Sequence, residues 1–181
     1  GGQERIVVWG ADRLTGHDAA TGKTLWTCEG FNPKQKGMWR TISSASVWEH
    51  IAVLSYGRGR NLCAIDLRDG LASAKRWLWN KDDMGADVPT PVTHDGKAYL
   101  LEDRGRIVCL DIKSGKKLWA SEAARDKGRY YASPILAGDR LYCVNEKGVV
   151  VVGNLKDRCT TITANRLNET VIATPVPVDD R

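Results

Sequence analysis

Aromatic and cationic residues gather in the segments that separate stretches of strand-like sequence. They are Trp39, Arg40, Arg58, Arg60, Arg129, Tyr130 and Tyr131. Aromatic rings stack on planar groups, and guanidinium groups bind carboxylates and phosphates through paired hydrogen bonds. Together these residues predict a rim that binds a planar or anionic ligand. The competing interpretation is that the charges are solvated in hairpin loops while Trp39 or Tyr131 packs between neighbouring sheets.

Three carboxylates, Asp82, Asp83 and Asp87, stand close enough in sequence to supply the hard oxygen ligands that calcium prefers. Their segment lacks the spacing of an EF-hand loop, so we predict no metal site there. The three histidines lie in separate turns without metal-ligand spacing, and no serine has the context of a hydrolase nucleophile. The sequence therefore predicts no catalytic residue and favours a protein that is not an enzyme.

The run Gly57-Arg58-Gly59-Arg60 has the glycines of a phosphate-binding loop. Such a loop must open a helix whose N-terminus faces the phosphate. Here the run joins two strand-like segments, so we do not interpret it as a nucleotide-binding motif.

Composition restricts the partners that the chain can have. The 181 residues carry a formal net charge of +5, but Lys and Arg alternate with Asp and Glu along the chain. This predicts a mixed surface and no specific nucleic-acid site. No apolar run approaches the ~20 residues of a membrane-spanning helix. The five cysteines are far apart and have apolar neighbours, so we expect buried thiols without disulfides.

A repeat organises the chain. Its copies begin at Thr90-Pro91, Ser133-Pro134 and Thr174-Pro175, which are 43 and 41 residues apart, and Ser44-Ala45 holds the same place in an earlier copy. Each copy contains four short alternating segments separated by Gly-containing turns, and no segment has a helical period. A repeat of this length is typical of β-propeller blades. We therefore predict an all-β fold of about four blades, each of four antiparallel strands, with almost no helix.

The blade boundaries follow from the repeat. We expect an incomplete blade over residues 1–43 that lacks its first strand, complete blades over 44–89, 90–132 and 133–173, and the first strand of a further or shared blade over 174–181. The chain is then a small four-bladed ring, half of a dimeric eight-bladed ring, or part of a seven- or eight-bladed propeller. Open sheet faces in the last two cases would favour a homodimer or other self-association.

Two segments carry a turn motif followed by a tryptophan: HDAATGKTLW at 17–26 and LDIKSGKKLW at 110–119. They resemble the Ala-x-Asp-x-x-Thr-Gly-x-x-x-Trp docking motif of the quinoprotein-like (pyrroloquinoline quinone repeat) propellers. The resemblance implies that the acid closes the turn and that the indole packs between blades. The structural docking residues would be Asp18, Trp26, Asp66, Trp77 or Trp79, Asp111 and Trp119. In the last blade Asn154 and Ile162 replace the acid and the indole, so that blade should pack least well.

The resemblance implies one of two functions. Some members of the superfamily are dehydrogenases that bind pyrroloquinoline quinone and calcium, whereas others are cofactor-free scaffolds that bind proteins, including those of outer-membrane assembly. Such dehydrogenases share a pair of adjacent cysteines over the quinone, and this chain has none. We therefore expect a non-catalytic protein- or ligand-binding module, with quinone and calcium only under the dehydrogenase alternative. The same resemblance, to the C-terminal part of bacterial propellers, suggests a periplasmic or extracytoplasmic location.

Overall fold

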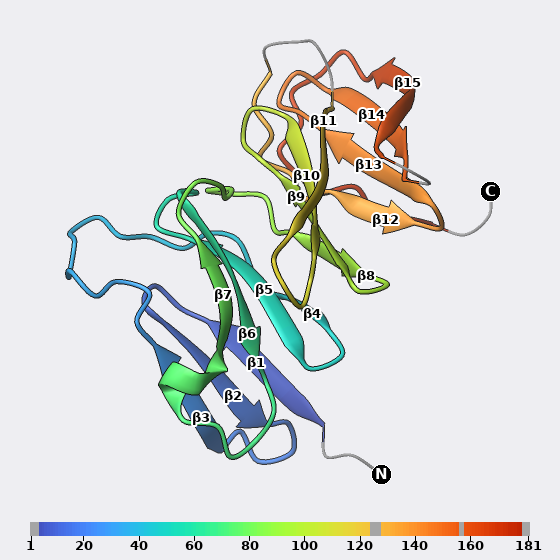
Figure 1. The fold of residues 1–181 in the computed structure, drawn as a ribbon. Coiled ribbons are helices and arrows are strands. Elements are labelled where there is room, and N and C mark those ends of the chain that lie inside the picture. Colours follow the sequence, from blue (N-terminus) through green and yellow to red (C-terminus); the bar gives the residue numbers. More distant parts are fainter. Residues whose placement is uncertain (1–3, 124–127, 156–157, 179–181) are drawn as a thin grey trace.

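The computed structural model describes residues 4–123, 128–155 and 158–178 and contains four antiparallel sheets (Figure 1). The first sheet has three strands, β1 (Arg5–Trp9), β2 (Arg13–Asp18) and β3 (Thr24–Glu29). The second has β4 (Ser46–Trp48), β5 (Ile51–Tyr56), β6 (Asn61–Asp66) and β7 (Trp77–Lys81). The third has β8 (Val92–His94), β9 (Lys97–Leu101), β10 (Arg106–Asp111) and β11 (Lys117–Glu122). The fourth has β12 (Ile135–Ala137), β13 (Arg140–Val144), β14 (Val149–Asn154) and β15 (Thr160–Arg166).

Within each sheet the strands pair in chain order, which confirms the predicted all-β propeller fold. The pairing of the last two strands slips by one residue at the same place in every sheet, after Gly16, Ala64, Cys109 and Val152. The one helical turn among the described residues is η1 (Ser73–Arg76), inserted between β6 and β7. No described helix is long and apolar enough to cross a membrane.

The sheets stand side by side in a row, and the core lies between them (Figure 1). One apolar cluster joins the first and second sheets, another the second and third, and another the third and fourth. All five cysteines are free and buried, four of them in these clusters, and burial raises the pKa of the Cys109 and Cys159 thiols to about 11. The first and last sheets lie at opposite ends of the row, so the described residues form an open arc and no closed four-bladed ring.

A chain of hydroxyl contacts ties each blade to the next at the start of the repeat. The backbone N–H of Ser44 donates to Thr90 Oγ1, that of Thr90 to Ser133 Oγ, and that of Ser133 to Thr174 Oγ1, at 2.9, 2.9 and 3.1 Å. These hydroxyl residues are the ones that mark the repeat in the sequence. They fix the register between blades because each satisfies a backbone donor of its neighbour.

Two expectations for the C-terminal part differ from what the structure shows. The strand predicted from residue 174 is not formed over the described residues 174–178, because no described strand lies beside them to pair with. Residues 179–181 lie outside the described part. β15 is the outer strand of the last sheet and is exposed along all seven residues, and at the tryptophan position it carries Thr163, not the predicted Ile162.

Candidate functional site

The motif turns close as the sequence predicts. Asp18 Oδ1 accepts hydrogen bonds from the backbone N–H groups of Ala20 and Thr21 and from the Thr21 hydroxyl. Asp111 Oδ1 accepts from the backbone N–H and the hydroxyl of Ser114, and these bonds lower the pKa of Asp111. Such side-chain bonds replace backbone bonds in a tight turn. The turns therefore present their backbone carbonyls in a fixed arrangement to the neighbouring sheet.

The sequence did not decide whether Trp77 or Trp79 is the docking residue of the second blade. In the structure, Trp79 packs on the next motif turn. Its Nε1–H donates to the backbone O of Ile112 at 2.9 Å, and its ring lies so close to Gly115 that a Cβ there would meet it at 2.6 Å. Trp79 pairs with Ala64, as Trp119 pairs with Cys109 and Trp26 with Gly16. These three tryptophans therefore hold one repeated position.

Trp77 faces the other way. Its Nε1–H donates to the backbone O of Glu29 at 3.2 Å, and its ring packs on Phe31 with centroids 4.5 Å apart. It therefore belongs to the layer between the first and second sheets, whereas Trp119 belongs to the layer between the third and fourth. The prediction that either Trp77 or Trp79 occupies the repeated position is resolved in favour of Trp79.

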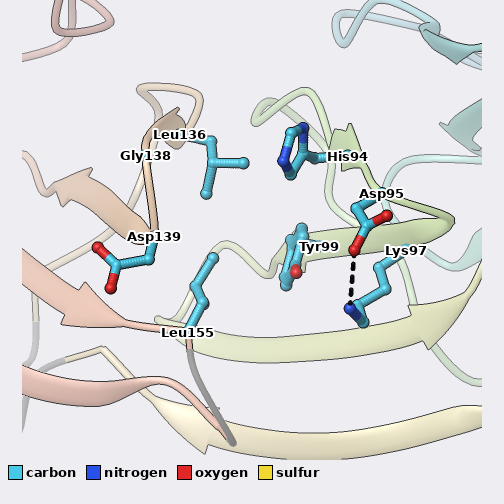
Figure 2. Close-up of a pocket in the computed structure, with 8 residues that line it drawn as sticks. All are labelled: His94, Asp95, Lys97, Tyr99, Leu136, Gly138, Asp139 and Leu155. Atoms are coloured by element: carbon cyan, nitrogen blue, oxygen red, sulfur yellow. Dashed lines mark ion pairs between the residues drawn. The ribbon is translucent and has the colours of Figure 1, made fainter.

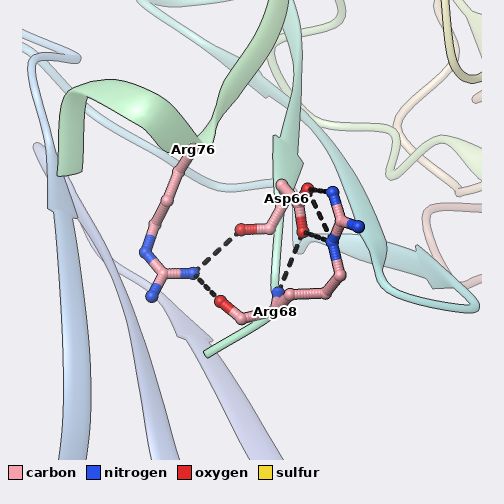
Figure 3. Close-up of polar contacts among 3 residues, drawn as sticks. All are labelled: Asp66, Arg68 and Arg76. Atoms are coloured by element: carbon pink, nitrogen blue, oxygen red, sulfur yellow. Dashed lines mark hydrogen bonds and ion pairs between the residues drawn. The ribbon is translucent and has the colours of Figure 1, made fainter. Parts of the chain in front are cut away.

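Between the first two sheets an arginine takes the place of the direct indole contact. The guanidinium of Arg76 lies over the Trp26 ring at 4.2 Å from its centroid, and Nη1 donates to the backbone O atoms of Asp66 and Arg68 at 2.9 and 2.8 Å (Figure 3). Arg76 is only 1% exposed, and burial lowers its pKa. The Asp66 carboxylate is bound by Arg68, which lowers the pKa of Asp66.

The rim residues lie on one face, which we term the loop face. It consists of the hairpins that join the second and third strands of each blade, 10–12, 57–60, 103–105 and 146–148, and of the segments that connect one blade to the next. Antiparallel strands bring these segments to the same edge. Function commonly lies on such loops because the sheets hold them in place.

Two of the predicted rim aromatics are not available as a stacking platform. Tyr130 is 1% exposed, because the hairpin glycine Gly105 lets its ring pack in the layer between the third and fourth sheets. Trp39 packs in the same manner on Gly57 and contacts the Tyr56 ring. The stacking role predicted for Tyr130 is therefore wrong, and that of Trp39 is limited because the residue is half-buried and Lys36 Nζ lies over its ring, 5.8 Å from the centroid.

The predicted rim cations differ in their contacts. Arg40 forms an ion pair with Asp87, which raises the pKa of Arg40. Arg58, Arg60 and Arg129 are exposed, and the described residues supply no carboxylate to pair with their side chains. Tyr131 is half-buried. The described residues thus leave three of the four predicted arginines free of ion pairs; Arg58 and Arg60 share the hairpin between β5 and β6, and Arg129 lies between β11 and β12.

Sequence reasoning missed a feature that recurs on the loop face, which is a basic residue at the hairpin tip in three of the four sheets; the hairpin of the first sheet, Gly10-Ala11-Asp12, has none. Arg58, Arg104 and Lys147 hold this place in the second, third and fourth sheets, and all are exposed. The acid that precedes the base faces inward instead. Asp103 accepts the backbone N–H groups of Asp87 and Val88.

Glu146 acts in the same way as Asp103. Its Oε1 accepts the backbone N–H of Arg129 at 3.0 Å. Acids that are neighbours of the bases in sequence are therefore used as loop anchors, and the bases remain on the surface. We term Arg58, Arg104 and Lys147 the cation row. The repeated tips Asp103-Arg104-Gly105 and Glu146-Lys147-Gly148 were the sequence signal that could have revealed it.

A pocket of about 300 Å³ lies beside the row, lined by Arg60, Asp82, Asp83 and Glu102 among others. Burial raises the pKa of Glu102. Asp87, the third carboxylate of the calcium hypothesis, is bound by Arg40 instead. Within residues 4–123, 128–155 and 158–178 no group of three His, Cys, Asp or Glu side chains could hold a metal ion.

Comparison with known proteins decides the family. A family model described as "Outer membrane protein assembly factor BamB", of the pyrroloquinoline quinone (PQQ) repeat type, matches residues 71–161, half of the chain. The chain belongs to the PQQ-repeat family. Its motif turns, slipped strand pairs and repeated tryptophan position are thus elements of a PQQ-repeat propeller.

Curated PQQ-repeat relatives fall into both functional classes. The outer membrane protein assembly factor BamB of Nitrosomonas eutropha is 26% identical over 129 residues, which cover 68% of this chain and 31% of that protein. A 1-butanol dehydrogenase (cytochrome c) of Thauera butanivorans is 31% identical over 90 residues, 49% of this chain and 13% of that protein. The chain thus spans about a third of the length of the first relative and a smaller part of the second.

Solved structures show the same fold. BamB from Moraxella catarrhalis superimposes with a TM-score of 0.70 at 16% identity, covering 94% of this chain and 47% of that one. A quinohemoprotein alcohol dehydrogenase from Comamonas testosteroni gives a TM-score of 0.68 at 12% identity, covering 94% of this chain and 35% of that one. At these identities the likeness shows the PQQ-repeat propeller fold alone.

Proposed function

We propose that this PQQ-repeat chain is a non-catalytic binding segment that engages the acidic part of a protein partner through its loop face. The observation that carries the proposal is the cation row, with one exposed base on each of three successive sheets. The likeness to BamB proteins, which are named as outer membrane assembly factors, supports a protein-binding role and an extracytoplasmic location.

The row is suited to recognition because its supports are rigid. Asp103 and Glu146 hold the connecting loops through hydrogen bonds to backbone N–H groups, which lowers the cost of ordering these loops when a partner binds. Complementary charge at an exposed surface raises association rate and specificity more than affinity. An acidic peptide segment, with carboxylates spaced along an extended chain, fits a row of separate cations.

Charge reversal tests the proposal. The triple variant Arg58→Glu, Arg104→Glu and Lys147→Glu is expected to bind a fluorescein-labelled peptide of alternating Glu and Ser at least tenfold more weakly than the wild type. Each exposed ion pair contributes roughly 0.2–1 kcal/mol, and repulsion adds to the loss. Fluorescence anisotropy at low and high salt measures the affinity, which should fall as salt increases.

A matched control has the same change of net charge on the opposite face. Lys23, Lys113 and Lys116 are exposed there, in the motif turns, and their reversal to Glu should leave binding within about threefold of the wild type. Equal losses in both triple variants would mean that the peptide responds to net charge only, and would contradict a role for the loop face.

A second function is favoured by one comparison, the likeness to the butanol dehydrogenase. The residues present do not fit a quinone and calcium site. No two cysteines are adjacent, all five thiols are buried, and Asp87 is bound by Arg40 while Asp103 anchors a loop. We therefore derive no catalytic step and keep the dehydrogenase as the alternative.

Self-association is expected from the outer face of the first sheet. Ile6 and Val8 point away from the second sheet and are 52% and 48% exposed, whereas Val7 and Trp9 on the other face are packed. Burying such side chains against a second copy of the chain is favourable by roughly 25 cal/mol per Å². Light scattering is expected to give a mass above the 20.0 kDa of one chain.

The variant Ile6→Glu with Val8→Glu is expected to lower that mass, because it places charges in the interface. A wild-type mass of 20.0 kDa at high protein concentration would contradict association through this face.

A further inference from the structure

A second pocket lies on the opposite face of the arc, between the third and fourth sheets (Figure 2). Its volume is about 230 Å³. His94, Lys97 and Tyr99 line it from the third sheet, and Leu136 and Leu155 from the fourth, with the Gly138-Asp139 turn at its edge. None of these residues belongs to the loop face, so the pocket is independent of the proposed function.

The same place between the second and third sheets is filled by the chain itself. Trp48 is the last residue of β4 and pairs with Ile51, as His94 is the last residue of β8 and pairs with Lys97. The Trp48 ring packs in the apolar layer and lies 3.8 Å from where a Cβ on Gly96 would be. An indole therefore occupies the position that His94 leaves open one blade further on.

Three equivalent positions differ between the two places. Trp48, Ile51 and Val53 face the third sheet, and by the strand register they correspond to His94, Lys97 and Tyr99. The replacements remove the large apolar ring and introduce an imidazole, an ammonium and a phenol. Polar groups at positions that a neighbouring repeat fills with apolar side chains indicate a site for something other than the chain's own core.

The polar groups are arranged around an apolar wall. Lys97 Nζ is 3.6 Å from an Asp95 carboxylate oxygen, so its charge has a partner within the protein. Tyr99 is 5% exposed, its hydroxyl makes no hydrogen bond to the described residues, and burial raises its pKa to about 12, so it stays protonated. The Tyr99 hydroxyl is accessible from the pocket, so it can form a hydrogen bond with a ligand that enters it. Leu136 and Leu155 form the opposite side (Figure 2).

We propose that this pocket binds an indole ring, the tryptophan side chain of a protein partner. The volume is below the ~300–1,000 Å³ of ordinary small-molecule sites, so it suits one side chain. The neighbouring repeat shows that the geometry accepts an indole. The Tyr99 hydroxyl and the His94 ring can accept the indole N–H, and Leu136 and Leu155 pack on the ring.

N-acetyl-tryptophanamide is the probe for this site, followed by NMR on the whole chain. A ligand of this size is expected to bind with a Kd on the order of 1 mM, with shift changes confined to residues 94–99 and 135–139. N-acetyl-leucinamide, which lacks the ring, is the matched ligand control and should bind at least fivefold more weakly.

Two variants test the pocket. His94→Trp places the chain's own indole where Trp48 lies in the other repeat and should weaken binding at least tenfold. Tyr99→Phe keeps the packing, removes the hydroxyl and should weaken binding about threefold. Unchanged binding in both variants, shift changes elsewhere, or equal binding of the leucine analogue would overturn the proposal. Weaker binding of N-acetyl-tryptophanamide to His94→Trp or Tyr99→Phe would support it, provided that the wild type binds this probe more tightly than N-acetyl-leucinamide.

Discussion

Replacing Trp79 by alanine is expected to lower the free energy of unfolding by about 3 kcal/mol, near the lower end of what tryptophan truncation costs in packed positions. The ring stacks on the Gly115 turn of the next sheet, and its Nε1–H satisfies the backbone O of Ile112 at 2.9 Å. The variant loses the packing of the ring and leaves that carbonyl without its donor. Urea unfolding followed by tryptophan fluorescence and circular dichroism measures the change.

Leu78 is the matched control because it is the adjacent residue, lies at the slip in the pairing of β6 and β7 and is 39% exposed. Leu78→Ala should cost under about 1 kcal/mol. Gly115→Ala should also destabilise the chain, since Gly115 has a φ of 66° and a Cβ there meets Trp79. Part of that cost should vanish in the Trp79→Ala background, as contacting residues are coupled. A Trp79→Ala variant as stable as Leu78→Ala would contradict inter-sheet docking by this ring.

Most of the fold could be predicted from the repeat in the sequence. Hydroxyl residues at Ser44, Thr90, Ser133 and Thr174 marked the blades, and the structure shows that they bridge the blades through backbone N–H groups. The marker was readable because the same contact recurs at every interface. A feature that occurs only once, such as the arginine between the first two sheets, has no such repetition.

The site was less readable because burial is decided by residues far away in sequence. Tyr130 was grouped with the exposed cations beside it, yet the lack of a Cβ at Gly105 lets its ring enter the core. The exposure of the charges in the cation row also depends on residues that are distant in sequence. Asp103 binds the backbone of residues 87 and 88, so the charge of Arg104 beside it is not balanced by an ion pair. Alternating charges in sequence therefore become separated charges on the surface.

The interface between the first and second sheets differs from that between the second and third because of an insertion in the second sheet. Trp79 follows Asp66 by 13 residues, whereas Trp26 and Trp119 follow Asp18 and Asp111 by eight. The additional residues form η1 and carry Arg76 into the layer between the sheets. Trp26 then lies against Gly16 of its own sheet, where a Cβ would meet the ring at 2.2 Å. The longer spacing was visible in the sequence, but its consequence for Trp26 was not.

Arg76→Met is expected to lower the free energy of unfolding by about 3 kcal/mol. The methionine keeps an apolar stem of similar length in the layer, but the backbone O atoms of Asp66 and Arg68 lose their donor, at about 1–3 kcal/mol each. Loss of the contact with the Trp26 ring adds about 0.5–2 kcal/mol. Removal of a desolvated charge offsets part of this sum, which is why the net value stays near that of one lost carbonyl partner.

Lys75→Met is the matched control, since Lys75 is the exposed neighbour in the same helical turn. It should change stability by under about 0.5 kcal/mol. Arg76→Lys should fall between the two, because one ammonium keeps the charge but lacks the planar fork that spans two carbonyls and stacks on an indole. Equal stability of Arg76→Met and Lys75→Met would show that the first two sheets are held by their apolar layer alone. If instead the free energy of unfolding rises from Arg76→Met to Arg76→Lys to the wild type, the guanidinium replaces the direct indole contact that Trp79 makes one interface further on.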